Sequence, residues 1–277
     1  MSATEPETTR IEPVVGWPGY GLGEAWRSRE LLIFLTERDL RVRYKQTVFG
    51  AAWAIAQPLI AMVLFTLVFG RLAGLPSEDV PYPVFVLAGT VPWGLVSSGL
   101  TTASSSLVAS QALIKKVYIH KMLVPASALL AHLLDVVIAM AVLVCVAAAY
   151  GYWPTWRLLA LPALLVLAFA VVLGLALAAS AVNVVFRDVR FVIPYVVQVW
   201  LFATPVAYSV TAVDAGYRQW FAANPFVGVV EGTRWIVLGT SNDLPLYVTS
   251  SVVGAVVLLL GGGYVFRRLE PSFADVA

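Results

Sequence analysis

Asp135 and His132 are the residues of the sequence best placed to handle a proton in apolar surroundings. Asp135 is the one acidic residue well within a long apolar run, and His132 lies three positions earlier, on the same face of a helix. A carboxylate at mid-membrane costs about 2.5–3.5 kcal/mol on insertion scales, so it must face a protein interior or water. The pair is either a proton relay or a structural polar pair, and the scarcity of other charges in the apolar runs favours the structural pair.

Glu231 and Arg234 form a second pair of charges in an apolar segment. They lie three positions apart and would share one face of a helix. Opposite charges that pair offset part of the cost of burying them. Structural pairing is therefore favoured over direct contact with a substrate.

The motifs of several enzyme classes do not occur in the sequence. There is no G-x-x-x-x-G-K-[ST], so the chain does not bind and hydrolyse ATP through such a phosphate loop. H-E-x-x-H and G-x-S-x-G are also missing, and His120, His132 and Cys145 are the only histidines and cysteine. We therefore predict no catalytic residue, no metal site and no cofactor held by this chain.

The composition is that of an integral membrane protein. Hydrophobic residues make up 60% of the 277 residues and charged residues only 12%, and the mean hydropathy is +0.85. Soluble domains contain about 25% charged residues. The net charge of +2 is small and scattered, which argues against a nucleic-acid partner. Runs such as 158–181 do not alternate between apolar and polar residues, so helices are predicted in place of barrel strands.

Six membrane-spanning helices are predicted in a transmembrane domain of residues 46–269, because about 20 apolar residues are needed for each span. The first apolar run begins near Gly50, too far along the chain for a cleavable signal peptide. The six predicted spans cover about 48–70, 84–107, 125–150, 158–186, 191–211 and 245–266.

The orientation follows from the positions of lysine and arginine. The N-terminal segment, the even loops and the C-terminal tail carry fourteen of them, whereas the odd loops carry four. Cytoplasmic loops hold the excess of positive charge in multi-pass proteins. Both termini, including the tail 270–277, are therefore predicted to be cytoplasmic.

The N-terminal part divides into a disordered leader, 1–21, and an amphipathic helix, 22–45, on the membrane surface. Apolar residues cover part of this helix, and its basic residues would face anionic membrane lipid. A soluble helix packing on a partner is the alternative. The basic residues assigned to this interface are Arg38, Arg41, Arg43 and Lys45.

Two connecting segments stand out. The basic loop 109–124 suits a short helix over about 110–122, which is either a topology signal or a docking helix for a cytoplasmic partner. The external segment 213–240 is too apolar for a loop and too interrupted for a span, so two short re-entrant helices meeting near Asn224–Pro225 are predicted. A seventh span would instead place Arg267 and Arg268 on the wrong face. A re-entrant pair indicates a pore or gate.

Small residues also repeat in the fourth predicted span, at Ala170, Gly174 and Ala178. This spacing lets two helices approach closely, within one chain or between two.

In order and spacing, several segments together resemble the membrane subunit of bacterial ABC-2 type polysaccharide exporters, which export O-antigen, teichoic acid or galactan on lipid carriers. The resemblance covers nearly the whole chain from about Leu31. The segments that carry it are Arg38–Thr47 running into Gly50 and Trp53, Gln57–Leu59, Phe186–Arg190, Thr204–Tyr208, and Asn224–Phe226 followed by Glu231 and Arg234.

The resemblance implies an all-α, type V exporter-like fold and a homodimer in the bacterial inner membrane. Two copies of a separate ATPase subunit, with its ATP and Mg²⁺, would power export of a lipid-linked polysaccharide. The loop helix would be the coupling helix, with Lys115, Lys116, Val117, Tyr118, His120 and Lys121 as ATPase-coupling residues. The re-entrant pair would be an outer gate containing Trp220, Asn224, Pro225, Phe226, Glu231 and Arg234.

Aromatic residues suit a path for a sugar polymer, because their rings offer flat apolar faces with a polar edge. The candidates are Tyr44, Trp53, Tyr195, Trp200, Phe202 and Tyr208. The alternative for each is an anchor at the membrane interface, as favoured for Trp153 and Trp156.

Two other functions compete with this interpretation. One is an ABC-2 exporter of drugs or small lipids. The other is a standalone channel or proton-coupled carrier that works through Asp135 and His132.

Overall fold

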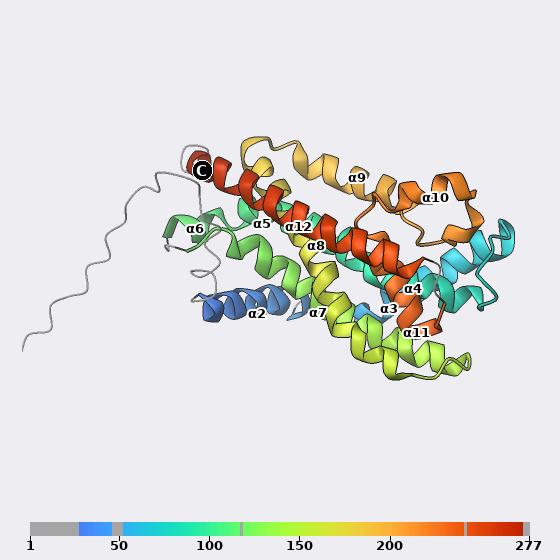
Figure 1. Cartoon of the computed structure of the whole chain (residues 1–277). Coiled ribbons are helices and arrows are strands. Elements are labelled where there is room, and N and C mark those ends of the chain that lie inside the picture. Colours follow the sequence, from blue (N-terminus) through green and yellow to red (C-terminus); the bar gives the residue numbers. More distant parts are fainter. Residues whose placement is uncertain (1–27, 46–51, 117–118, 241–242, 274–277) are drawn as a thin grey trace, which may run out of the picture.

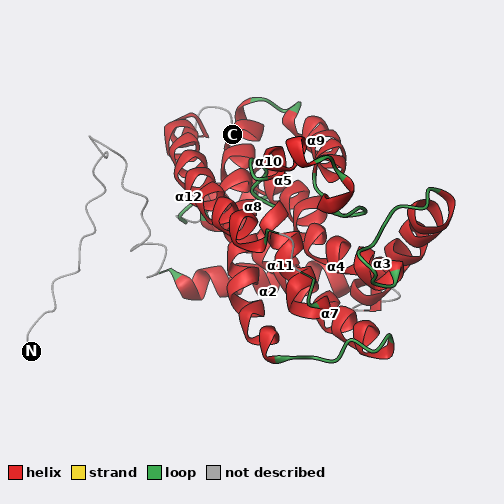
Figure 2. Ribbon diagram, turned by 45° about the vertical axis from the view of Figure 1, so that its right-hand side comes forward, coloured by secondary structure: helices red, strands yellow, loops and turns green. Residues whose placement is uncertain are grey.

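The computed structural model describes residues 28–45, 52–116, 119–240 and 243–273, and in these ranges it contains helices and no β-strand (Figure 2). The predicted leader 1–21, the start of the predicted interface helix, residues 48–51 of the first span and residues 274–277 of the tail lie outside the described residues.

The helices follow one another along the chain with short connections (Figure 1). Their bounds are α2 (Arg29–Lys45), α3 (Ala52–Phe65), η1 (Thr66–Leu72), α4 (Tyr82–Gly94), η2 (Leu95–Leu100), α5 (Thr101–Ala109), α6 (Gln111–Lys116), α7 (Leu123–Ala149), η3 (Trp156–Ala160), α8 (Leu161–Val185), α9 (Val189–Ala203), η4 (Val210–Ala212), α10 (Ala215–Phe221), α11 (Val227–Leu238), α12 (Leu244–Leu269) and η5 (Glu270–Ser272).

Five helical stretches of the described chain are long and apolar enough to cross a membrane, which confirms an all-α, multi-pass architecture. Helix α9, in the place of the fifth predicted span, is apolar but only 15 residues long. The five long stretches are Ala52–Leu72, Tyr82–Ala109, Leu123–Ala149, Trp156–Val185 and Leu244–Ser272.

Helix α9 ends earlier than the predicted limit at residue 211. Its last residue is Ala203, and Thr204 has φ −110° and ψ 134°, an extended conformation. The cause is Pro205, since the ring of a proline disfavours the helical conformation of the residue before it. Because apolar residues continue past Ala203, hydropathy alone did not indicate where this helix ends.

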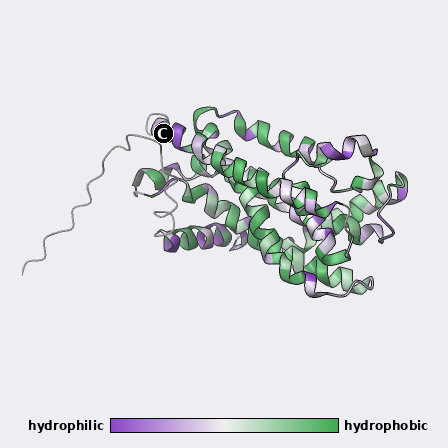
Figure 3. Cartoon of the chain, in the orientation of Figure 1, coloured by the Kyte–Doolittle hydropathy of each residue, from purple (hydrophilic) through white to green (hydrophobic). Residues whose placement is uncertain are grey.

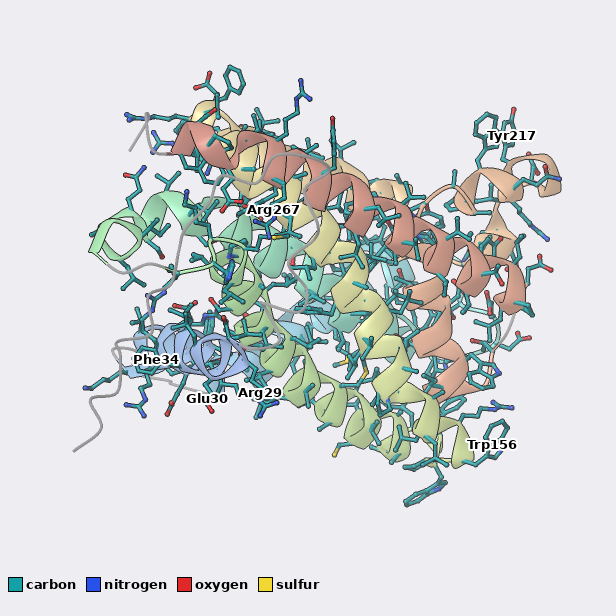
Figure 4. The ribbon with its side chains drawn as sticks, turned by 60° about the vertical axis from the view of Figure 1, so that its left-hand side comes forward. Arg29, Glu30, Phe34, Trp156, Tyr217 and Arg267 are labelled. Carbon is teal, nitrogen blue, oxygen red and sulfur yellow. The ribbon has the colours of Figure 1, made fainter. Side chains whose placement is uncertain are left out.

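The connections between the long helices gather at two opposite ends of the molecule. Helix α6, the start of α2 and the end of α12 lie together at one end, here called the α6 end, and α10 lies at the other, the α10 end (Figure 1). Polar residues gather toward both ends and apolar residues fill the middle (Figure 3). Arg29 and Phe34 belong to the α6 end, whereas Trp156 and Tyr217 belong to the α10 end (Figure 4).

Helices α8 and α12 pack lengthwise at a very close distance. A Cβ atom added to Gly262 would lie 1.9 Å from the carbonyl oxygen of Gly174, and one added to Gly174 would lie 2.4 Å from the carbonyl carbon of Leu258. The predicted role of the small residues in close packing therefore applies to two helices of the same chain.

Gly174→Leu is expected to destabilise the protein, because its side chain would overlap the backbone of α12. Overpacking of this kind costs about 1–3 kcal/mol or more, so the thermal unfolding midpoint in detergent should fall. Gly261→Leu is the matched control, because nothing lies within 4 Å of a Cβ atom at Gly261. Equal midpoints for the two variants would contradict the packing account.

Candidate functional site

A cavity of about 510 Å³, here called the α3 cavity, lies between the end of α2 and helices α3, α4, η2 and α7. Element η2 is a π-helical turn, which is wider than an α-helical turn, and it contributes to the wall of the cavity. Such π-helical turns occur often at functional sites. Its polar lining comes from Arg43, Tyr44, Gln57, Thr90, Ser97, Ser98, His132 and Asp135, and Trp53 and Trp93 are among its aromatic residues.

A polar cluster, here called the Asp135 clamp, joins α2 to α7 at this cavity. Arg43 forms an ion pair with Asp135, and the Tyr44 hydroxyl donates a hydrogen bond to the same carboxylate. Burial and this hydrogen bond raise the pKa of Tyr44 to about 12. Nearby, the Ser127 hydroxyl donates to the Asp39 carboxylate at 3.3 Å and joins the two helices a second time.

His132 extends the clamp to α5, and its two hydrogen-bond partners determine which ring nitrogen carries the proton. Arg43 can only donate, so the His132 Nδ1 that lies 3.2 Å from it accepts, and the proton of the imidazole is on Nε2, 3.0 Å from the Thr102 hydroxyl. The Nδ1 atom is 3.6 Å from Asp135, beyond hydrogen-bond range. The clamp therefore favours the structural interpretation of Asp135, with Arg43 as its principal partner.

The partner of Asp135 was not evident from the sequence. Arg43 was assigned to the basic face toward lipid, but it lies against α7, 92 positions before Asp135. The sequence signal that could have found it is the requirement that a carboxylate within a span has a cationic partner. The polar residues Gln57, Ser97 and Ser98 of the cavity wall were also missed.

Of the other residues assigned to the basic face, Arg41 and Lys45 are exposed and Arg38 is half-buried. Arg38 pairs with Asp39 at 2.7 Å, Arg41 pairs with Glu37 at 2.5 Å, and Lys45 is exposed. Ile33, Phe34 and Val42 are 62–72% exposed on the same helix. Charged and large apolar side chains thus share the surface of α2, as in helices at a membrane interface.

A second, larger depression of about 1010 Å³, the α9 groove, runs along α9 toward the α10 end. It has an apolar lining from α8, α9 and α12, and it brings three of the predicted path residues next to three predicted gate residues. These six are Trp200, Phe202, Tyr208, Trp220, Asn224 and Pro225. Tyr195 lines neither depression and is 72% exposed.

Asn224 holds the junction between α10 and α11 against the end of α9. Its side-chain oxygen accepts a hydrogen bond from the Trp200 indole at 3.1 Å, and its amide donates to the Thr204 hydroxyl at 2.9 Å. Trp200 also meets Trp93 edge to face, with ring centroids 5.5 Å apart. The end of α9 and the α10–α11 junction are thereby fixed to each other.

Helix α11 is anchored by a fully buried ion pair. Arg234 is 0% and Glu231 2% exposed, and their side chains lie 2.7 Å apart. Arg234 also donates to the carbonyl of Val206 at 2.9 Å and lies 3.8 Å from the centre of the Phe85 ring. The predicted structural pairing of these charges is present. Phe226, also predicted for the gate, is 0% exposed.

The predicted coupling residues lie at the α6 end. Helix α6 contains Lys115 and Lys116, and His120 and Lys121 follow it, whereas Val117 and Tyr118 lie outside the described residues. The Lys121 amino group donates to the carbonyl of Glu270 at 3.4 Å. Lys121 is therefore engaged by the C-terminal segment of its own chain.

The described residues contain no group of three or more His, Cys, Asp or Glu side chains arranged to hold a metal ion. What the site offers is two depressions with aromatic walls and a charged clamp between helices.

Comparison with known proteins identifies relatives over nearly the whole chain. An O-antigen export system permease protein of Myxococcus xanthus is 27% identical over 257 residues, which cover 91% of this chain and 97% of the relative. An O-antigen export system permease protein of Klebsiella pneumoniae is 24% identical, with 93% and 97% covered. A polysialic acid transport protein of Escherichia coli is 24% identical, with 78% and 81% covered.

Residues 30–238 match the family described as ABC-2 type transporter, from the second residue of α2 to the last residue of α11. Because this match covers well over half of the chain, the protein belongs to the ABC-2 type transporter family.

Proposed function

We propose that this chain is the transmembrane subunit of an ABC transporter that exports a lipid-linked polysaccharide across the bacterial inner membrane. The observation that carries the proposal is the similarity to O-antigen export permeases over 97% of their length. The polysialic acid transport relative supports the same substrate class.

The positions of the aromatic residues support a sugar polymer as the substrate. Tyr44 and Trp53 line the α3 cavity, and Trp200, Phe202 and Tyr208 line the α9 groove. Aromatic faces contact the C–H faces of sugars without fixing them by charge. A polymer can therefore slide past these rings.

The membrane topology that we propose has six spans, with α9 as the short fifth, and places the α6 end and both termini in the cytoplasm. In this orientation α10 and α11 form a re-entrant gate at the outer surface. Helix α11 is anchored by Arg234, whereas Tyr217 and Trp220 of α10 are 64% and 74% exposed. We infer that α10 is the moving part of the gate and α11 its fixed base.

The assembly that we propose is a homodimer with two copies of a separate ATPase subunit, which bind ATP and Mg²⁺. The sequence lacks a phosphate loop, so in this assembly we assign ATP binding to the separate subunit. Within the described chain, Ala54 is the one residue of Ala52–Leu72 that is buried. Most of this span is therefore available for contact with lipid or with a second copy of the chain.

Deletion of the encoding gene tests the substrate class. We expect loss of a surface polysaccharide and accumulation of its lipid-linked form inside the cell, both reversed by the intact gene. A mutant with normal surface polysaccharide and a defect in drug or small-lipid export would support the competing ABC-2 function instead.

The coupling role of α6 is tested by Lys115→Glu together with Lys116→Glu. We expect these charge reversals to lower the amount of polymer exported per ATP hydrolysed by roughly 5- to 150-fold, the usual range for coupling between two sites. Polymer exported per ATP hydrolysed is the quantity to measure, with Arg268→Glu, a reversal of an exposed charge in the last turn of α12, as the control. An unchanged ratio would count against a docking role for α6.

A further inference from the structure

A second hydrophobic cluster lies at the α6 end, apart from the main core. Partly buried residues from α2 and α6, namely Leu31, Leu113 and Ile114, pack against it. The buried members of the cluster are Leu107, Ile119, Val124, Leu177, Ala181, Val184, Phe266 and Phe273. Residues from α2, α6 and the C-terminal segment thus share one small core.

The C-terminal segment Leu269–Phe273, here called the strap, continues α12 through the 3₁₀ turn η5 and lies against this cluster. Arg267, labelled in Figure 4, pairs with Glu270 at 3.1 Å and holds the turn of η5. Phe273 is only 6% exposed and meets Phe266 edge to face at 5.6 Å between ring centroids. The strap is therefore fixed to α12 by one ion pair and one ring contact.

The strap contacts the segment that connects α6 to α7 through Lys121. The Lys121 amino group lies 3.4 Å from the Glu270 carbonyl oxygen and 5.4 Å from the centre of the Phe273 ring. A hydrogen bond and a cation–π contact on one amino group hold it to the strap. Ile119, two residues before Lys121, is buried in the same cluster.

We propose that the strap positions the coupling helix, so that force applied to α6 moves α7 and not α6 alone. The inference rests on the proposed function of α6 as the helix that meets the ATPase subunit. A six-residue helix has too few internal hydrogen bonds to keep its own orientation. Lys121 and Phe273 are positioning residues in this scheme, and the strap lies beyond the family match, which ends at residue 238.

The physical reason is that coupling requires a rigid base. If the segment after α6 could swing, movement of the ATPase would be absorbed by that segment before it reached α7. The strap prevents this by fixing the segment to the end of α12, which packs along α8. Displacement of α6 then reaches α7 and, through the Asp135 clamp, α2 and the α3 cavity.

The test uses Phe273→Ala and Lys121→Met in the complete complex, reconstituted with its ATPase. We expect polymer exported per ATP hydrolysed to fall roughly 2- to 30-fold in each variant, the range seen for mutations along coupled networks. In Phe273→Ala, ATP hydrolysis and the yield of assembled complex should stay near wild type. Phe273→Tyr and Lys121→Arg, which keep the ring and the cation, should retain the wild-type ratio, as should Arg268→Ala at the exposed end of α12.

Hydrogen exchange supplies a second readout that does not depend on transport. We expect Phe273→Ala to speed exchange of the backbone amides of α6 and leave those of α11 unchanged. Unchanged exchange and an unchanged export ratio would overturn the strap proposal alone. If the wild-type chain bound no ATPase subunit, the proposed function would be overturned, whatever the result of the exchange experiment.

A merely structural role for the strap predicts a different pattern. In that case complex yield and unfolding midpoint would fall together with export, and the polymer-to-ATP ratio of the surviving complex would stay at the wild-type value. This outcome would also contradict the proposal.

Discussion

Asp135→Ala is expected to reduce polysaccharide export at least roughly tenfold, because it removes the carboxylate that holds Arg43 and Tyr44 at the α3 cavity. Hydrogen bonds to charged groups contribute about 1.5–3 kcal/mol each. Their loss weakens the attachment of the end of α2 to α7 and leaves Arg43 without its carboxylate. The quantities to measure are polymer exported per assembled complex and the unfolding midpoint in detergent.

A double variant separates pairing from proton transfer. Asp135→Ala with Arg43→Ala removes both charges, and we expect it to recover part of the stability lost in Asp135→Ala alone, since no unpaired cation remains. Asp135→Asn keeps an acceptor for Tyr44 and should retain more export than Asp135→Ala. If Asp135→Asn abolished export in a complex of normal yield and stability, the structural interpretation would fail and the proton-coupled carrier would gain support.

Arg234→Met is expected to have the largest effect on stability of any substitution near the proposed gate. It leaves the Glu231 carboxylate, which is 2% exposed, without its cation. Removing one partner of a buried ion pair costs about 3–5 kcal/mol. The hydrogen bond to Val206 and the contact with the Phe85 ring are lost as well. We expect a clear fall in the unfolding midpoint and in the yield of folded protein.

Two matched variants check the cause of this loss. Glu231→Gln with Arg234→Met removes the unpaired charge and should be more stable than Arg234→Met alone. Arg268→Ala removes an exposed arginine from the end of α12 and should leave the midpoint unchanged. If Arg234→Met were as stable as Arg268→Ala, helix α11 would not be anchored as described.

The long apolar helices were predictable because hydropathy is a local signal that persists over many residues. Tyr82–Ala109 and Leu244–Ser272 extend beyond the predicted 84–107 and 245–266 by only a few residues at most ends. The two short helices that flank Asn224–Pro225 were also predictable, since charges and a proline interrupt an apolar segment there. Each of these features depends on residues that are neighbours in the sequence, so the sequence alone indicates it.

Contacts between distant residues were not predictable in the same way. Nothing local indicates that Arg43 lies against Asp135 or that Lys121 meets Phe273, because both pairs depend on how whole helices pack. The predicted gate residues likewise divide into a buried group around Arg234 and a group at the α9 groove that includes Trp220. Residue type alone does not distinguish these environments.

Reconstitution in proteoliposomes tests directly whether this chain moves polysaccharide only together with an ATPase subunit. The chain would be purified with and without its ATPase subunit and supplied with a lipid-linked polysaccharide and ATP·Mg²⁺. We expect the ATPase to co-purify, polymer to cross the bilayer only when both chains and ATP are present, and the chain alone to move none. ATP-independent movement of polymer by the chain alone would contradict this expectation.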